Sequence, residues 1–259
     1  MTDTAFIGAT SPLGKIWTSK RYFDYLVDQN EIHLLQGHAY AVLVIIDPVF
    51  WAGPHAAEQD DNAKDGYAFH FKRQLSDIKA ERIIYITSAD IIPEDGDELS
   101  PLRDPAGNPG INRQRDLYNF INKQFGRVLN VFIPELAISD PAFGVLGLLT
   151  PPADKKASLP VALLEQHQLY PIDRLVDDVE RAIPLGIENV ILATPPVTTC
   201  ELVEQLYPEL ADNLPDARTS DPRGSTRTSI HSFHWHDPKD GYITTKEDLL
   251  NTLGAMLDH

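Results

Sequence analysis

Residues 5–14, AFIGATSPLG, have the types and spacing of a turn that can hold a phosphate group. Gly8 permits a tight turn without a Cβ clash, and Ser11 followed by Pro12 is a favourable helix start. Gly14 lies where that helix must pack closely on the preceding strand. The free N–H groups of such a helix end form an anion site suited to a pyrophosphate. The alternative is an ordinary strand–helix turn stabilised by the Ser-Pro cap.

This turn requires a strand before it and a helix after it, and the sequence predicts both. Thr4–Ile7 is predicted to form a short buried strand, and apolar residues at steps of three and four predict a helix over residues 13–29. Ala41–Ile46 is apolar throughout, which is typical of a strand covered on both faces. Further strands are predicted at 31–35, 82–87, 128–133 and 189–192, helices at 67–78, 111–125, 172–183, 199–207 and 246–257, and irregular connections at 54–66, 93–109 and 140–160. Strands alternating with helices indicate an α/β fold with a doubly wound parallel sheet.

Four segments resemble the extended short-chain dehydrogenase/reductase superfamily, which includes nucleotide-sugar epimerases and dehydratases. GATSPLG resembles the glycine turn of that family, and AVLVIID resembles the strand beneath the nicotinamide ribose. RIIYITSADII resembles the strand with the catalytic Ser or Thr, and YPIDRLVDDVERAI resembles a later strand end that leads into a helix. The resemblance implies a Rossmann-like core over residues 1–137 and 168–197, with a smaller, discontinuous C-terminal substrate domain over 138–167 and 198–259.

The same resemblance implies roles for individual residues. The implied cofactor is NAD or NADP, and the implied ligand is a small molecule such as a nucleotide sugar. Ser88 matches the catalytic hydroxyl of the family. Arginine suits a diphosphate, so Arg113, Arg223 and Arg227 are candidate substrate contacts. The expected cofactor-binding residues are Gly8, Thr10, Ser11, Pro12, Leu13, Gly14, Asp47 and Thr87.

The Tyr-x-x-x-Lys pair that transfers a proton in this family has no counterpart at the expected position. Setting Pro109 against the proline that often precedes the Tyr places Gly110 at the Tyr position and Gln114 at the Lys position. Glycine has no side chain and glutamine does not titrate, so neither can do acid–base work. Tyr242 and Lys246 have the right spacing but lie near the C-terminus, where a chance match is the better explanation.

The second predicted strand leaves the choice between NAD and NADP open. No Asp or Glu ends residues 31–35, where an acid would hold the adenosine ribose, and Gln36 and His38 follow instead. Lys15 and Arg21 could meet a 2′-phosphate, although surface solubility explains both. The stretch before Ala41 is also shorter than the helix–strand unit that the family usually has there.

Residues 229–237, SIHSFHWHD, place three imidazoles close together, a composition that can bind zinc. In an extended segment His234 and His236 share one face and His231 takes the other. We therefore expect a polar loop or edge strand and no metal site. The segment Arg223–His236 is expected to close over the site and contact an anionic group of the ligand.

Composition excludes several classes of function. The 259 residues contain 38 acidic and 22 basic side chains, a net charge of −16, which disfavours binding to nucleic acid or anionic lipid. The single cysteine, Cys200, rules out a disulfide framework. The longest apolar stretches are too short to span a bilayer and no secretory signal is evident, so we expect a cytoplasmic protein without a membrane partner. The sequence does not decide whether the protein forms a homodimer.

Two hypotheses about function remain. The first is an NAD(P)-binding protein resembling nucleotide-sugar epimerases, dehydratases and reductases, with atypical or weakened catalysis. The second is a catalytically silent protein that senses a dinucleotide or metabolite. The missing Tyr and Lys favour the second hypothesis, whereas Ser88 and the arginines of the C-terminal segment favour the first.

Overall fold

The computed structural model describes residues 3–48, 61–105, 107–138, 146, 164–208, 230–234 and 240–257. The chain divides into two compact units. The first contains Met1–Pro93, Pro101–Ile133 and Asp173–Ile191, and the second contains Glu94–Ser100, Pro134–Ile172 and Leu192–His259. Each unit has a hydrophobic core of its own.

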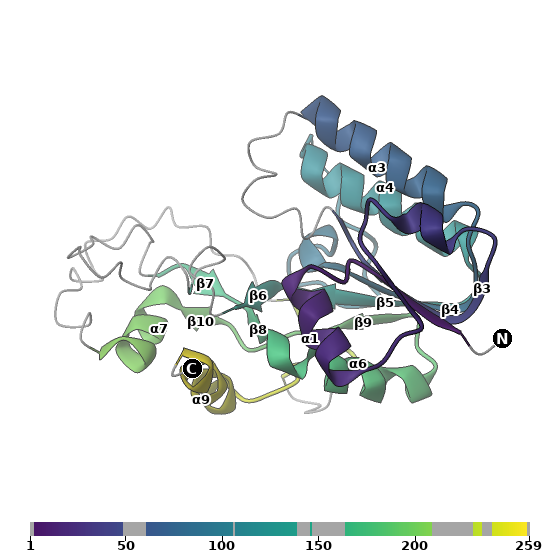
Figure 1. Cartoon of the computed structure of the whole chain (residues 1–259). Helices are drawn as coiled ribbons and strands as arrows, with labels where there is room; N and C mark the ends of the chain where they lie inside the picture. Colours follow the sequence, from purple (N-terminus) through teal and green to yellow (C-terminus); the bar gives the residue numbers. More distant parts are fainter. Residues whose placement is uncertain are drawn as a thin grey trace. The chain divides into compact units, whose positions relative to one another are not determined.

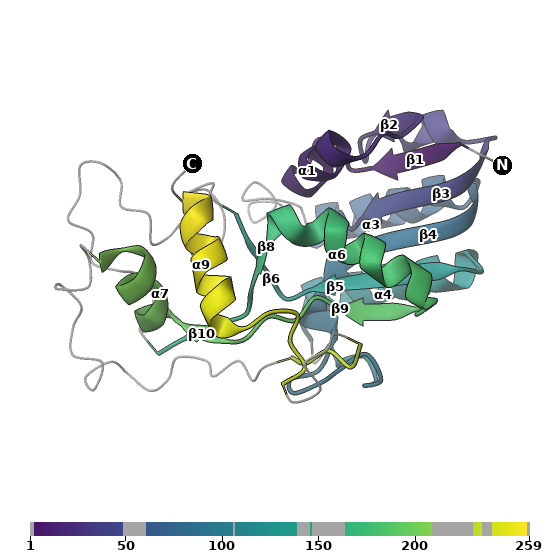
Figure 2. The same ribbon diagram turned by 90° about the horizontal axis from the view of Figure 1, so that it is seen from below.

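A six-stranded sheet in the order β2-β1-β3-β4-β5-β9 forms the centre of the first unit. Every neighbouring pair of these strands is parallel. Helices α3 and α4 cover one face of the sheet, and α1 and α6 cover the other (Figure 1, Figure 2). The predicted α/β class with a doubly wound, Rossmann-like parallel sheet is therefore confirmed. The elements are β1 (Thr4–Ile7), α1 (Pro12–Lys20), β2 (Tyr25–Val27), η1 (Ile32–Leu35), β3 (Ala39–Ile46), α3 (Asp61–Leu75), β4 (Lys79–Ser88), η2 (Ala89–Ile91), α4 (Pro109–Gln124), β5 (Val128–Ile133), η3 (Ile172–Arg174), α6 (Leu175–Ala182), η4 (Ile183–Leu185) and β9 (Asn189–Ile191).

The segment after the first helix differs from the sequence prediction. Helix α1 ends at Lys20 instead of continuing to residue 29, and Arg21 is already extended, with φ −136° and ψ 137°. Residues 25–27 form the edge strand β2, paired in parallel with β1. Residues 31–35, predicted as a strand, contain the short 3₁₀ turn η1. Helix α3 also begins at Asp61, within the stretch predicted as a loop over 54–66.

The core on the α3 and α4 side explains why β3 and β4 are apolar. Alternate side chains of these strands pack against the inner faces of the two helices. The neighbouring strand β5 has one polar side chain among its apolar ones, that of Asn130, which is 1 % exposed. Its amide nitrogen donates to Asn122 in α4 and to Asn189 in β9, both at 3.0 Å. The core residues on this side include Leu43, Ile45, Phe71, Leu75, Ile83, Tyr85, Leu117 and Ile121.

The second unit is built from two small sheets and two helices. Strand β10 pairs with β7 in the antiparallel sense, and β6 pairs with β8 in the parallel sense. Thr198 and Glu201 form a reciprocal capping box at the start of α7. Glu201 also accepts a hydrogen bond from Lys246 at 2.8 Å, which ties α7 to α9. The elements are β6 (Glu135–Ala137), β7 (Gln166–His167), β8 (Leu169–Pro171), β10 (Val197–Thr198), α7 (Thr199–Leu206) and α9 (Lys246–Leu257).

Candidate functional site

The glycine turn leaves β1 through a conformation that glycine favours. Gly8 has a φ of +95°, in the left-handed region that L side chains rarely adopt. Its N–H donates to the carbonyl of Val27 at 2.9 Å, which joins the turn to the end of β2. A Cβ at this position would lie 3.1 Å from the Cβ of Ile46 in β3. The turn is therefore held tightly against both neighbouring strands.

Ser11 caps helix α1 with its side chain directed back into the turn. Its Oγ donates to the carbonyl of Gly8 at 2.7 Å and accepts from the N–H of Gly14 at 3.0 Å. The residue is only 6 % exposed. Ser11 stands where the usual fingerprint has its middle glycine, and this inward orientation keeps its side chain away from the front of the helix N-terminus.

Gly14 allows an unusually close approach between α1 and the turn. A Cβ built on Gly14 would lie 2.2 Å from the carbonyl oxygen of Gly8 and 2.7 Å from that of Ala9. Both atoms belong to the backbone, so any larger residue must push the helix away from β1. Close packing of helix on strand is the role that the third glycine has in dinucleotide-binding turns. The residues present therefore fit a dinucleotide pyrophosphate.

Asp28, which sequence reasoning missed, lies directly after β2 and next to the glycine turn. The Oγ1 of Thr10 donates to its carboxylate, with distances of 2.6 and 2.7 Å to the two oxygens. Asp28 follows Gly8 by about 20 residues, the spacing at which dinucleotide-binding folds place the acid for the ribose hydroxyls. The conclusion that no acid ends the second strand is therefore corrected. It followed from placing that strand at 31–35.

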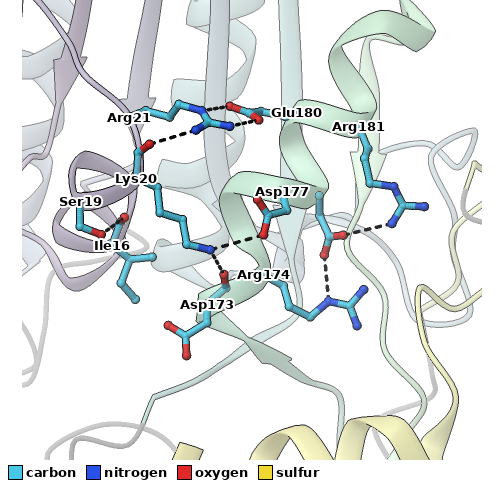
Figure 3. Close-up of polar contacts among 10 residues, drawn as sticks. Ile16, Ser19, Lys20, Arg21, Asp173, Arg174, Asp177, Glu180 and Arg181 are labelled. Atoms are coloured by element: carbon cyan, nitrogen blue, oxygen red, sulfur yellow. Dashed lines mark hydrogen bonds and ion pairs between the residues drawn. The ribbon is translucent and has the colours of Figure 1, made fainter.

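Helix α1 is fastened to α6 by ion pairs at its C-terminal end (Figure 3). Lys20 Nζ donates to the carbonyl of Asp173 at 2.6 Å and lies 3.4 Å from the Asp177 carboxylate. Arg21 makes a two-pronged contact with Glu180. The Arg21 hydrogen bond lowers the pKa of Glu180. The Arg21 guanidinium is thus paired with Glu180 of α6, so it does not serve as a contact for a 2′-phosphate.

Asp47 and Thr87, both predicted to bind cofactor, meet at the ends of β3 and β4. The Oδ2 of Asp47 accepts from Thr87 Oγ1 and from the Tyr85 hydroxyl, each at 2.6 Å. Asp47 and Thr87 are fully buried. Burial, followed by the Asp47 charge, raises the pKa of Tyr85 far above its usual range. The two hydroxyls compensate the cost of burying the carboxylate.

Ser88, the predicted catalytic hydroxyl, ends β4 and is 2 % exposed. Its Oγ accepts from the N–H of Asp90 at 3.1 Å and caps the short turn η2. This contact gives Ser88 a structural task in addition to any chemical one.

Helix α4 carries the positions of the missing Tyr and Lys. Asn108 caps the helix and Pro109 begins it, so Gly110 lies in the first turn and Gln114 one turn later. Gln114 is 6 % exposed. A Cβ on Gly110 would meet only the Asn108 side-chain oxygen, at 3.3 Å. Arg113, the nearby candidate substrate contact, donates to Asp65 in α3 at 3.1 Å.

The C-terminal candidates are only partly described. Arg223, Arg227 and His236 lie outside the described residues. The ring of His231 lies 5.3 Å from that of Tyr242, between centroids. Within the described part of the chain, no group of three or more His, Cys, Asp or Glu residues is placed to hold a metal ion. No helix among the described residues is long and apolar enough to cross a membrane.

The strand order and the glycine turn are Rossmann-like, and the fold is similar to that of solved extended short-chain dehydrogenases/reductases, among them nucleotide-sugar epimerases and reductases. The crystal structure of the Bordetella bronchiseptica enzyme WbmH in complex with NAD+ matches with a TM-score of 0.62 and 12 % identity, covering 100 % of this chain and 98 % of that one. The dTDP-4-dehydrorhamnose reductase of Yersinia enterocolitica matches with a TM-score of 0.61 and 11 % identity over 100 % and 99 % of the chains.

A third similar structure is the UDP-glucose 4-epimerase of Thermotoga maritima with UDP-glucose. It has a TM-score of 0.57 and 11 % identity, covering 99 % of this chain and 98 % of that one. At these identities the likeness establishes the fold. No protein-family model matches the sequence, and no curated protein matches it.

Proposed function

We propose that this protein binds NAD in preference to NADP through the turn formed by Gly8, Ser11 and Gly14. The observation that carries this proposal is the position of Asp28, beside that turn and at the end of β2. A carboxylate there accepts hydrogen bonds from the 2′- and 3′-hydroxyls of an adenosine ribose. It repels the additional 2′-phosphate of NADP, and the nearby Arg21 is committed to Glu180.

The pyrophosphate belongs at the N-terminus of α1. The helix dipole favours an anion there, and the Leu13 N–H is available for it because, among the described residues, it has no hydrogen-bond partner. Pro12 contributes no N–H, and the N–H of Gly14 is taken by Ser11. Asp47 and Thr87, at the ends of β3 and β4, would then lie alongside the bound molecule.

The usual acid–base chemistry of this fold is weakened or absent. NAD, when bound, supplies a hydride acceptor, but the chain must supply the group that moves the accompanying proton. Gly110 and Gln114 leave the first two turns of α4 without a phenol or an ammonium group. Ser88 alone can orient a substrate oxygen but has no activated proton to exchange.

The ligand that fits beside the dinucleotide is a small molecule of the nucleotide-sugar class. Support comes from the structures that share this fold, one of which holds UDP-glucose and NAD. A second candidate function is a catalytically silent sensor of the dinucleotide. The pair Gly110 and Gln114 favours it, because a sensor needs the binding turn but not the proton-transfer pair.

Two measurements test the proposal. Thermal unfolding with millimolar NADH or NADPH should show a rise in midpoint that is larger for NADH; no shift with either would exclude the binding function. Turnover of a panel of sugar nucleotides should stay near background, since acid–base groups contribute about 10²–10⁴-fold each. Rapid turnover lost in Ser88→Ala would show an intact active site and would exclude the sensor.

A further inference from the structure

Tyr67 of α3 is hydrogen-bonded to Gln29, the residue that follows Asp28. The hydroxyl of Tyr67 donates to Oε1 of Gln29 at 2.5 Å. Gln29 comes directly after Asp28, at the end of β2. The contact therefore joins α3 to the edge of the candidate dinucleotide site, although Tyr67 lies 38 residues beyond Gln29 in the chain.

The phenol of Tyr67 lies within electrostatic reach of two carboxylates that follow strands of the sheet. Burial raises the pKa of Tyr67 most, and the charges of Asp28 and Asp47 raise it further. These carboxylates follow β2 and β3, which flank β1 on its two sides. The phenol thus lies close to carboxylates that follow the strands on both sides of β1, and it stays protonated at neutral pH, as a hydrogen-bond donor must.

This hydrogen bond holds the Gln29 carboxamide with Oε1 facing Tyr67. A carboxamide has an oxygen that accepts and a nitrogen that donates, and the two ends are otherwise nearly interchangeable. A donor at Oε1 fixes the oxygen towards Tyr67 and leaves its second lone pair available. Among the described residues, the Gln29 amide nitrogen has no hydrogen-bond partner. The oriented group therefore offers an acceptor and a donor side by side.

That pattern is complementary to one nucleobase edge. Gln pairs with adenine by accepting from N6 and donating to N7. Hypoxanthine carries an oxygen at position 6, which would face the Gln oxygen and repel it. In a dinucleotide whose ribose lies at Asp28 and whose pyrophosphate lies at α1, the base extends beyond Asp28, on the side of the next residue.

We propose that Gln29 reads the adenine base of the bound dinucleotide and that Tyr67 is the positioning residue that orients it. This inference rests on the proposed NAD-binding function. It assigns selectivity for the base to the contact between Tyr67 of α3 and Gln29, which follows β2, the edge strand of the sheet.

The test compares NADH with its hypoxanthine analogue, nicotinamide hypoxanthine dinucleotide in the reduced form, by calorimetric titration. The two ligands differ only in the base, which has an oxygen in place of the amino group at position 6 and a hydrogen on N1. A bidentate pair of this kind gives about tenfold discrimination or more, so wild-type protein should prefer NADH by at least that factor. Tyr67→Phe should reduce the ratio to within about threefold of one, and Gln29→Met should do the same.

Tyr118→Phe is the matched control. Tyr118 is also a partly buried helix tyrosine of the first unit, and its hydroxyl donates to an amide oxygen, that of Asn189, at 3.3 Å. Its removal should leave the NADH preference unchanged. Thermal midpoints of all variants separate loss of selectivity from unfolding, and Gln29→Met provides a second route if Tyr67→Phe fails to fold.

The outcomes separate the two proposals. Equal binding of the two dinucleotides by wild-type protein, or an unchanged ratio in both Tyr67→Phe and Gln29→Met, overturns the base-reading inference and leaves NAD binding intact. Failure of wild-type protein to bind either dinucleotide overturns the proposed function, and the inference with it.

Discussion

The hydroxyl of Thr10, in the glycine turn, donates to the carboxylate of Asp28 at 2.6 Å. This hydrogen bond connects the loop after β1 to the residue after β2, so the phosphate-binding and ribose-binding parts of the candidate site are held together before any ligand arrives. Such preorganisation reduces the loss of conformational entropy when the ligand binds. A ribose hydroxyl that donates to Asp28 would share the carboxylate with the Thr10 hydroxyl or would displace that hydroxyl.

Replacing Asp28 by Asn should reverse the cofactor preference. The neutral amide loses charge-assisted hydrogen bonds worth about 1.5–3 kcal/mol, so NADH affinity should fall by roughly 10- to 100-fold. NADPH affinity should fall much less, because the repulsion of its 2′-phosphate disappears. Asp24→Asn is the control, since Asp24 lies at the opposite end of β2 and accepts from Thr4 at 2.8 Å. Equal losses in the two variants would show that Asp28 does not face the ribose.

Replacing Gly14 by Val should remove dinucleotide binding. The added Cβ meets backbone oxygens of Gly8 and Ala9, so α1 must shift and its N-terminus leaves the pyrophosphate position. We expect a loss of at least about tenfold in NADH affinity and a destabilisation of about 1–3 kcal/mol. Gly254→Ala is the control in α9, where a Cβ would be 3.7 Å from Leu206, an ordinary contact. Fluorescence titration and urea unfolding measure the two effects, and wild-type affinity in Gly14→Val would contradict the account.

Restoring the missing pair should create activity where little exists. A Cβ at Gly110 meets only the Asn108 oxygen, so the backbone there accepts a side chain; Gly110→Tyr supplies the phenol, and Gln114→Lys places an amine one turn further along α4. The double variant should raise NAD-linked turnover of sugar nucleotides by about 10²-fold or more over wild type. Each single variant should give much less. A wild type that is already as active as the double variant would mean that another residue supplies the proton.

The contact between α1 and α6 should contribute stability that depends on pH. Arg21 lowers the pKa of Glu180 below its ordinary value of 4.5 in the folded protein. Its contribution is therefore fully present well above pH 4.5 and is lost as pH falls through the lower folded value. Wild type should exceed Glu180→Gln in urea midpoint at pH 7 by more than it does near pH 4. Glu81→Gln, an exposed glutamate of β4, should show no such difference; a larger Glu180→Gln effect in acid would contradict the pairing.

The elements predicted from the sequence were mostly those with strong local signals. Strands such as 41–46 are apolar throughout, and α7 and α9 have capping residues at their starts. The edge strand β2 was missed because Phe23, Leu26 and Val27 continue the helical spacing of α1 by coincidence. Residues 21–29 contain no Gly or Pro that would indicate the end of the helix. Pairing with β1, a non-local interaction, decides the conformation there.

That one error also concealed part of the site. With residues 13–29 taken as a helix, Asp28 falls on a helix surface instead of a strand end, and its link to Thr10 is invisible. The spacing of about 20 residues from Gly8 to an acid was the signal that could have found it. The Tyr67–Gln29 contact could not be predicted, because it depends on how α3 packs beside η1, the turn that follows β2, and no local pattern encodes that packing.

The most direct test of the central claim is a calorimetric titration of the wild-type protein with NADH and, separately, with NADPH. We expect saturable binding of NADH, binding of NADPH at least about tenfold weaker, and no binding heat for NADH in Gly14→Val. Absence of heat with millimolar concentrations of both dinucleotides would contradict that claim, as would tighter binding of NADPH than of NADH.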